Sequence, residues 1–137
     1  MYNTSTLVGR PTKAITEDSL KRSKKGTAIL NLSIAQTKGK RGTDTERPQF
    51  FDVTVFGTLA ENLVKSGITT RDVLVVLGQQ DFRQWKAPDG TNRTAVSVIA
   101  DFVGPDMTFA TVAVERNPLP NAAGDPGVAE PEEIETL

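Results

Sequence analysis

The fold is decided by residues 50–66, FFDVTVFGTLAENLVKS, where the spacing of a strand changes directly into the spacing of a helix. The strand half alternates two sets of side chains: first Phe51, Val53 and Val55, and second Phe50, Asp52, Thr54 and Phe56. Successive strand residues point to opposite faces, so the first set predicts a core face and the second an outer face. The outer set combines two aromatic rings with a carboxylate and a hydroxyl, which indicates a surface that stacks on a flat ligand.

The helix half of this run is short. Its apolar residues recur at the spacing of one helix face: Leu59, Ala60, Leu63 and Val64. Thr58 is placed to cap the N-terminus, and Gly67 is placed to end the helix. We therefore predict one helix over residues 58–66.

Strand patterns precede this run. Residues 7–9 form a short apolar strand candidate, and residues 27–35 alternate leucine and isoleucine with polar or small residues. Between them, residues 21–26, KRSKKG, predict a basic hairpin tip. Residues 38–47 are polar, contain two glycines and predict a flexible basic loop.

Further strands follow the helix. Residues 71–77 are rich in β-branched side chains and predict a strand buried in a barrel. Another strand reaches Trp85, residues 87–90, APDG, predict a turn, and residues 94–103 return as the final strand.

This order predicts an all-β fold, a five-stranded Greek-key barrel of the OB type with one short helix. Gly9 and Gly57 are expected at bends or bulges of the curled sheet. Proline and glycine interrupt any periodicity after Pro105. We therefore predict an OB domain over residues 1–105 and a disordered acidic tail over residues 106–137.

The amino-acid composition excludes several classes of function. The chain has 137 residues, 37% of them hydrophobic, and contains neither cysteine nor histidine. Cys/His zinc sites and histidine-dependent catalysis are therefore excluded, and with no phosphate-binding Gly-Lys-Ser loop we expect no enzyme activity, cofactor or metal. No signal peptide or membrane-spanning run is evident, so we expect a cytoplasmic protein.

The net charge of −1 is unevenly distributed. Residues 1–103 hold 15 basic and 10 acidic side chains, a net +5, whereas residues 104–137 hold 1 basic and 7 acidic, a net −6. A basic domain with an acidic tail favours a polyanionic ligand for the domain.

The ligand face is predicted around a tryptophan. Strand alternation in residues 81–85, DFRQW, puts Arg83 and Trp85 on one face, a cation beside a large π-system. Such a pair suits a ligand that carries both phosphates and bases. We predict base stacking on three residues: Phe50, Phe56 and Trp85. A core role for Trp85 and a barrel-capping role for Phe56 are the alternatives.

Basic side chains surround these rings and are predicted to contact phosphates: Arg10, Lys38, Lys40, Arg41, Arg47, Arg83, Lys86 and Arg93. A second, lower-ranked group lies in the basic hairpin tip: Lys21, Arg22, Lys24 and Lys25. The alternative is that these cations only keep loops soluble.

The pieces together resemble the bacterial-type single-stranded DNA-binding protein family. The similarity lies in LVGR at residues 7–10, GTA and LNLSIA within residues 26–35, VTVFGTLAE at residues 53–61, and RQW, DG and RT within residues 83–94. This resemblance implies an OB-fold homotetramer that binds single-stranded DNA with little sequence preference in replication, recombination and repair. It also implies base stacking at Phe50, Phe56 and Trp85.

Two features depart from the family pattern. The loop at residues 38–47 lacks an aromatic near its start, and the chain ends EPEEIETL rather than in an acidic tip closed by proline and phenylalanine. A divergent, phage-encoded member would show such departures, acting at the nucleoid or in an infected host's cytoplasm. We predict that the tail binds replication or repair proteins through its last residues: Glu132, Glu133, Ile134, Glu135 and Leu137. An OB module that binds protein or RNA is the alternative function.

Overall fold

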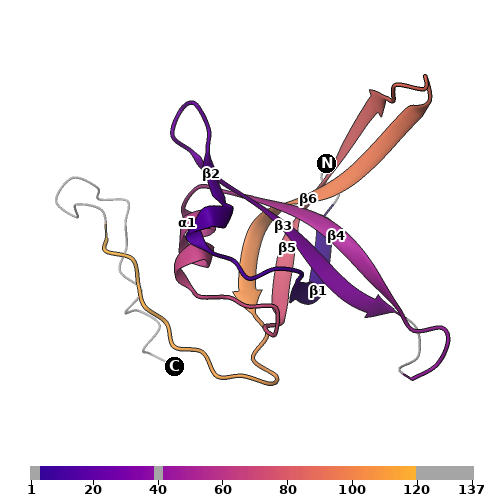
Figure 1. The fold of residues 1–137 in the computed structure, drawn as a ribbon. Helices are drawn as coiled ribbons and strands as arrows, with labels where there is room; N and C mark the ends of the chain where they lie inside the picture. Colours follow the sequence, from indigo (N-terminus) through magenta and orange to yellow (C-terminus); the bar gives the residue numbers. More distant parts are fainter. Residues whose placement is uncertain (1–3, 39–41, 120–137) are drawn as a thin grey trace.

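The computed structural model describes residues 4–38 and 42–119 (Figure 1). Eight elements follow one another along the chain: β1 (Thr4–Pro11), the 3-10 helix η1 (Glu17–Ser19), β2 (Leu20–Arg22), β3 (Ala28–Lys38), β4 (Arg47–Phe56), α1 (Gly57–Lys65), β5 (Leu74–Lys86) and β6 (Asn92–Pro105). The predicted order of strands, one helix and a long hairpin is confirmed.

Strand pairing closes the sheet into a ring. The six-stranded order is β1-β5-β6-β4-β3-β2, and β1 also pairs with β3 through Arg10–Ala35 and Pro11–Ile34. β1, β5, β6, β4 and β3 therefore form the predicted five-stranded OB barrel, in which only the β4–β6 pair is parallel. β2 is an additional short strand that pairs with β3 alone and forms the basic hairpin.

The core lies inside this ring and follows the predicted alternation. The largest fully buried side chains come from three strands of the barrel, β3, β4 and β5: Leu30, Ile34, Val53, Val55, Leu74 and Val76. The branched side chains fill the barrel, and the opposite face of each strand is left at the surface.

The helix covers one end of the barrel, and its start differs from the prediction. α1 begins at Gly57, and its N-cap residue is Phe56, which makes no side-chain capping bond. The prediction of Thr58 as N-cap was wrong: the N-cap lies two residues earlier, because the chain turns into the helix at Gly57, which adopts a φ of 70°. The helix ends as expected, with Ser66 as C-cap followed by Gly67 at a φ of 66°.

Two hairpins extend beyond the barrel as arms (Figure 1). The β5–β6 arm pairs continuously from Gly78–Ala100 to Lys86–Asn92 around the predicted turn, and the β3–β4 arm runs to Lys38–Arg47. β5 begins at Leu74 rather than Arg71, and β6 extends from Asn92 to Pro105.

The sheet irregularity is also displaced from the expected glycines. It lies between Leu77 and Gly78, where β6 carries one extra residue, Asp101. Gly9 was predicted at a bend or bulge, but it pairs regularly with Leu74 and lies where β1 passes close to the backbone of β3.

The chain beyond the barrel has no helix or strand up to residue 119, and residues 107–119 are exposed. None of the helices in the described residues is long and apolar enough to cross a membrane.

Candidate nucleic-acid interface

The candidate interface is the outer face of four neighbouring strands, β3, β4, β6 and β5. Ser33 pairs with Asp52, Asp52 with Ser97, and Ser97 with Asp81, so these four side chains form one row across the face. Paired residues share a face and alternate residues return to it. The same face therefore carries Phe50 and Phe56 of β4 and Arg83 and Trp85 of β5.

The three predicted stacking residues are exposed. The exposed fractions are 62% for Phe50, 44% for Phe56 and 43% for Trp85. The guanidinium carbon of Arg83 lies 5.5 Å from the centre of the Trp85 ring, within the range of a cation–π contact. The alternative of a core role for Trp85 does not fit this exposure.

The cations of the β5–β6 arm divide between its two faces. Arg93 pairs with Trp85 and joins it on the outer face. Lys86 follows Trp85 directly and pairs with Asn92, so its side chain leaves from the opposite face. Arg83 and Arg93, but not Lys86, therefore border the Trp85 ring.

Two of the remaining predicted cations, Arg10 and Arg47, belong to the described residues. Arg10 pairs with Ala35, and Ala35 pairs with Phe50, so Arg10 belongs to the row of the Phe50 ring. Arg47 is exposed at the start of β4 and pairs with Lys38, but alternation along β4 places its side chain on the opposite face from Phe50. The side chain of Lys38 and the whole of Lys40 and Arg41 lie outside the described residues, as does the end of the tail: Glu132, Glu133, Ile134, Glu135 and Leu137.

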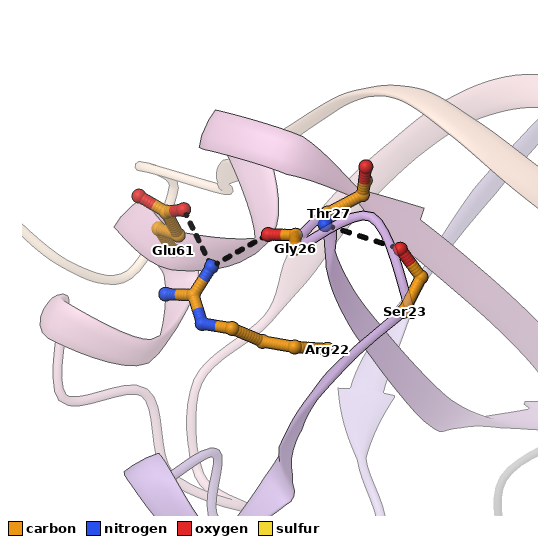
Figure 2. Close-up of polar contacts among 5 residues, drawn as sticks. All are labelled: Arg22, Ser23, Gly26, Thr27 and Glu61. Carbon is orange, nitrogen blue, oxygen red and sulfur yellow. Dashed lines mark hydrogen bonds and ion pairs between the residues drawn. The ribbon is translucent and has the colours of Figure 1, made fainter.

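The basic hairpin between β2 and β3 is tied to the helix (Figure 2). Nη1 of Arg22 donates to Oε1 of Glu61 at 3.3 Å and to the carbonyl oxygen of Gly26 at 3.1 Å. Arg22 is therefore engaged in holding the turn, whereas Lys24 and Lys25 are exposed at its tip.

The turn of the β5–β6 arm is held by a carboxylate. Oδ1 of Asp89 accepts hydrogen bonds from the Thr91 hydroxyl at 2.6 Å and the Thr91 amide at 3.0 Å. Both bonds favour the ionised carboxylate and lower the pKa of Asp89 below its usual value. The arm therefore carries a fixed negative charge, the carboxylate of Asp89, at its tip.

Sequence reasoning missed an exposed apolar patch beside this face. Val8 is 45% exposed, Leu77 is 42% exposed and Phe102 is 55% exposed, although Leu77 lies in a run that predicts a buried strand. Leu77 of β5 pairs with Phe102 of β6, and Val8 of β1 lies diagonally opposite Leu77, since Val8 pairs with Val75. These three neighbouring side chains form an exposed apolar patch on the sheet. The sequence signal is the occurrence of apolar residues at successive positions rather than at alternate ones.

Within residues 4–38 and 42–119, no group of acidic side chains is placed to hold a metal ion.

The model of the single-strand binding protein family matches residues 2–109. The chain belongs to this family.

Several relatives carry the name single-stranded DNA-binding protein. The relative from Corynebacterium glutamicum is 29% identical over 109 residues, which are 76% of this chain and 48% of the relative. The one from Deinococcus radiodurans is 32% identical over 78 residues, 55% of this chain and 26% of the relative. The one from Thermotoga maritima is 27% identical over 105 residues, 74% and 72% of the two chains. The chain thus spans less than half the length of the first two relatives.

Proposed function

We propose that this family member binds single-stranded DNA by stacking bases on the outer face of its barrel, largely without regard to sequence. The observation that supports this most is the joint exposure of Phe50, Phe56 and Trp85 on one face, with Arg83 against the Trp85 ring. Every base has a π-face, so aromatic platforms bind strands of any sequence, and neighbouring cations neutralise the backbone.

The free energy available from base stacking is large enough to support the proposed binding. One base stacked on one aromatic side chain contributes about 1 to 3 kcal/mol, so three platforms supply at most about 9 kcal/mol before ordering costs. Phosphate contacts from the arms and from further subunits add to this. Binding of this kind needs no reaction, and we propose a non-catalytic role in replication, recombination and repair in the cytoplasm.

The experiment is a titration that follows the emission of Trp85, the only tryptophan. A single strand should quench this emission strongly, and a duplex of equal length should not, because paired bases hide their faces. Equal quenching by the duplex, or no quenching by either, would contradict the proposal. Tighter binding of an RNA strand would favour the alternative of an RNA-binding OB module.

We further propose that the chain assembles as a homotetramer. Residues 4–9 of β1 pair with β5 on one side only, because β3 pairs with β1 only at Arg10 and Pro11. Such an open edge can pair with a second copy, and the patch of Val8, Leu77 and Phe102 beside it supplies apolar surface to bury. Four barrels would then present their stacking faces to one long strand.

The acidic tail is proposed as a regulatory segment. Its net charge of −6 opposes the +5 of residues 1–103, so it can compete with DNA for the same cations and be released when DNA binds. Ile134 and Leu137 are the apolar residues proposed to anchor replication or repair proteins among the neighbouring glutamates.

A further inference from the structure

The stacking face is hollowed beside Phe50. The segment that joins β1 to η1 runs along the free edge of β3, where the amide of Thr12 donates to the carbonyl oxygen of Ser33 at 2.9 Å. Together with β3 and β4 this segment encloses a hollow of about 280 Å³, bordered by Lys13, Ile15, Asn31, Ser33 and Asp52 among others. A cavity of about 150 Å³ accommodates a benzene ring, so this hollow is large enough for a purine base.

The hollow lies one step from the Phe50 ring. Asp52 follows Phe50 by two residues on the same face of β4, a separation of roughly 6.6 Å along the strand. Ser33 of β3 and Asp52 of β4 are directly paired, so their side chains lie next to each other where the sheet borders the hollow. A strand with one base stacked on Phe50 therefore has an adjacent nucleotide within reach of the hollow.

The polar groups of the hollow leave hydrogen-bonding capacity for a ligand. Among the described residues, no hydrogen bond or ion pair engages the carboxylate of Asp52 or the ammonium of Lys13. Asn31 uses Oδ1 to accept from the Thr54 hydroxyl at 3.1 Å, which keeps its amide in place at the wall. A carboxylate on a surface that receives phosphates repels them, so Asp52 is better suited to the donor groups of a base than to the backbone.

We propose that this hollow binds one base per subunit and favours guanine, an inference that rests on the proposed binding of single-stranded DNA. Asp52 accepts hydrogen bonds from N1–H and the 2-amino group of guanine through its two oxygens. Lys13 donates to O6 at the other end of the same base edge.

Guanine is the base that matches this set of groups. A carboxylate has two acceptor oxygens side by side, and guanine offers two adjacent donors on its Watson–Crick edge with an acceptor next to them. Cytosine and adenine each offer one amino group flanked by an acceptor. Thymine offers one N–H between two carbonyl oxygens, which a carboxylate repels. The stacking platforms bind all four bases, and Asp52 adds a preference at one position.

The test compares two strands of equal length, one of thymines only and one with isolated guanines separated by thymines so that no quadruplex forms. Each unlabelled strand competes for the full-length protein against a fluorescent thymine strand. A bidentate contact of this kind distinguishes bases by about fivefold at the low end of its range, and we expect at least about that preference for the guanine strand. Inosine lacks the 2-amino group, so replacing the guanines by inosine should remove most of the preference.

Two variants locate the effect. Asp52→Asn should reduce the preference to less than about twofold, because one of its two acceptor oxygens is replaced by a donor. Asp81→Asn is the matched control, since Asp81 lies in the same row of the face but does not border the hollow. Both variants remove one negative charge and should bind the thymine strand somewhat more tightly, but Asp81→Asn should keep the guanine preference.

The outcomes separate this inference from the proposed function. Equal binding of both strands by the unchanged protein, or an undiminished preference in Asp52→Asn, would overturn the guanine site and leave single-strand binding intact. Binding of neither strand would overturn the proposed function and this inference with it.

Discussion

Among single residues, Trp85 gives the clearest test of stacking. We expect Trp85→Ala to weaken binding of a thymine strand by about 1 to 3 kcal/mol, the contribution of one base stacked on one ring. The side chain is 43% exposed, so the melting temperature should change little. Fluorescence anisotropy of a labelled strand and thermal unfolding measure the two effects separately.

Phe82→Ala is the matched control for this change. Phe82 lies on the same strand and is 55% exposed, but alternation places it on the opposite face of the arm from Arg83 and Trp85. It should leave the affinity for DNA nearly unchanged. Equal losses in the two variants would mean that the arm acts as a whole rather than through its outer face.

The sequence pattern predicted the exposure of the aromatic side chains better than it predicted which face the cations lie on. Phe50 and Phe56 were correctly predicted to be exposed. Side chains alternate along a strand, so the burial of Val53 and Val55 puts Phe50 and Phe56 on the outer face. Long basic side chains carry no such signal, and the position of Lys86 depends on strand register. The exposure of Leu77 could not be predicted either, because an exposed apolar residue within an apolar run looks like a core residue in the sequence.

Among the elements, the turn of the β5–β6 arm should respond to acid. Asp89 has a lowered pKa in the folded chain, so its hydrogen bonds to Thr91 stabilise the turn above the pKa of the unfolded carboxyl, about 3.9. This contribution is lost as the pH falls through the lower, folded value. The amide proton shift of Thr91 in nitrogen–proton correlation spectra should therefore titrate below about pH 4.

Asp89→Asn is the control for this titration. Asparagine keeps an acceptor oxygen for Thr91 but has no proton to gain in this range. The Thr91 amide shift should then be independent of pH, while the equivalent pair of Asp106 and Thr108 continues to titrate, since the pKa of Asp106 is lowered by the same two bonds. A Thr91 shift that still titrates in the variant would show that another group controls the turn.

The closure of the barrel depends on two glycines inside strands. A Cβ at Gly78 would collide with the carbonyl oxygen of Ile99, and one at Gly9 would lie 2.7 Å from Cγ2 of Ile34 and closer still to the backbone of Ala35. We expect Gly9→Ala and Gly78→Ala each to lower the free energy of unfolding in urea by about 1 to 3 kcal/mol through overpacking.

Gly104→Ala is the control for closure. Its Cβ would meet only the ring of Phe102, with the nearest contact at 3.1 Å to Cζ, and an exposed ring can move aside. A loss as large as that of Gly78→Ala would indicate that glycine is needed for chain flexibility rather than for close approach.

The elements themselves could be predicted, but their ends could not. Hydrophobic alternation identified the strands and helical spacing identified α1, because both reflect burial in one core. The start of α1 at Gly57 and the bulge at Leu77–Gly78 depend on backbone conformations that come from tertiary packing. Only the β1–β3 pairing closes the barrel, and such distant pairings leave little trace in local sequence.

For the whole molecule, the proposed tetramer places Leu77 at a subunit contact. Leu77→Lys would bury an unpaired charge there, so the sedimentation coefficient should fall toward that of a dimer or monomer. Val96→Lys is the control, because Val96 is 47% exposed but lies on the arm rather than in the apolar patch. A monomer for the unchanged chain at micromolar concentration, or an unaltered tetramer for Leu77→Lys, would contradict this assignment.

The distribution of charge over the molecule leads to a prediction about salt. The net +5 of residues 1–103 and the net −6 of residues 104–137 attract each other, so the tail should compete with DNA at low ionic strength. Deleting residues 112–137 should modestly raise the affinity for a single strand at low salt. The gain should disappear as salt increases, because charges separated by more than about 10 Å are screened at 0.1 M.

A variant that keeps the length of the tail but removes its charges distinguishes an electrostatic effect of the tail from a steric one. Replacing Glu130, Glu132, Glu133 and Glu135 by glutamine removes four negative charges and should reproduce most of the gain seen on deletion. If only the deletion raises the affinity, the tail hinders DNA sterically and the effect should persist at high salt. If neither change alters the affinity at low salt, and the full-length and truncated chains capture the same proteins, the tail only keeps the protein soluble and has no regulatory role.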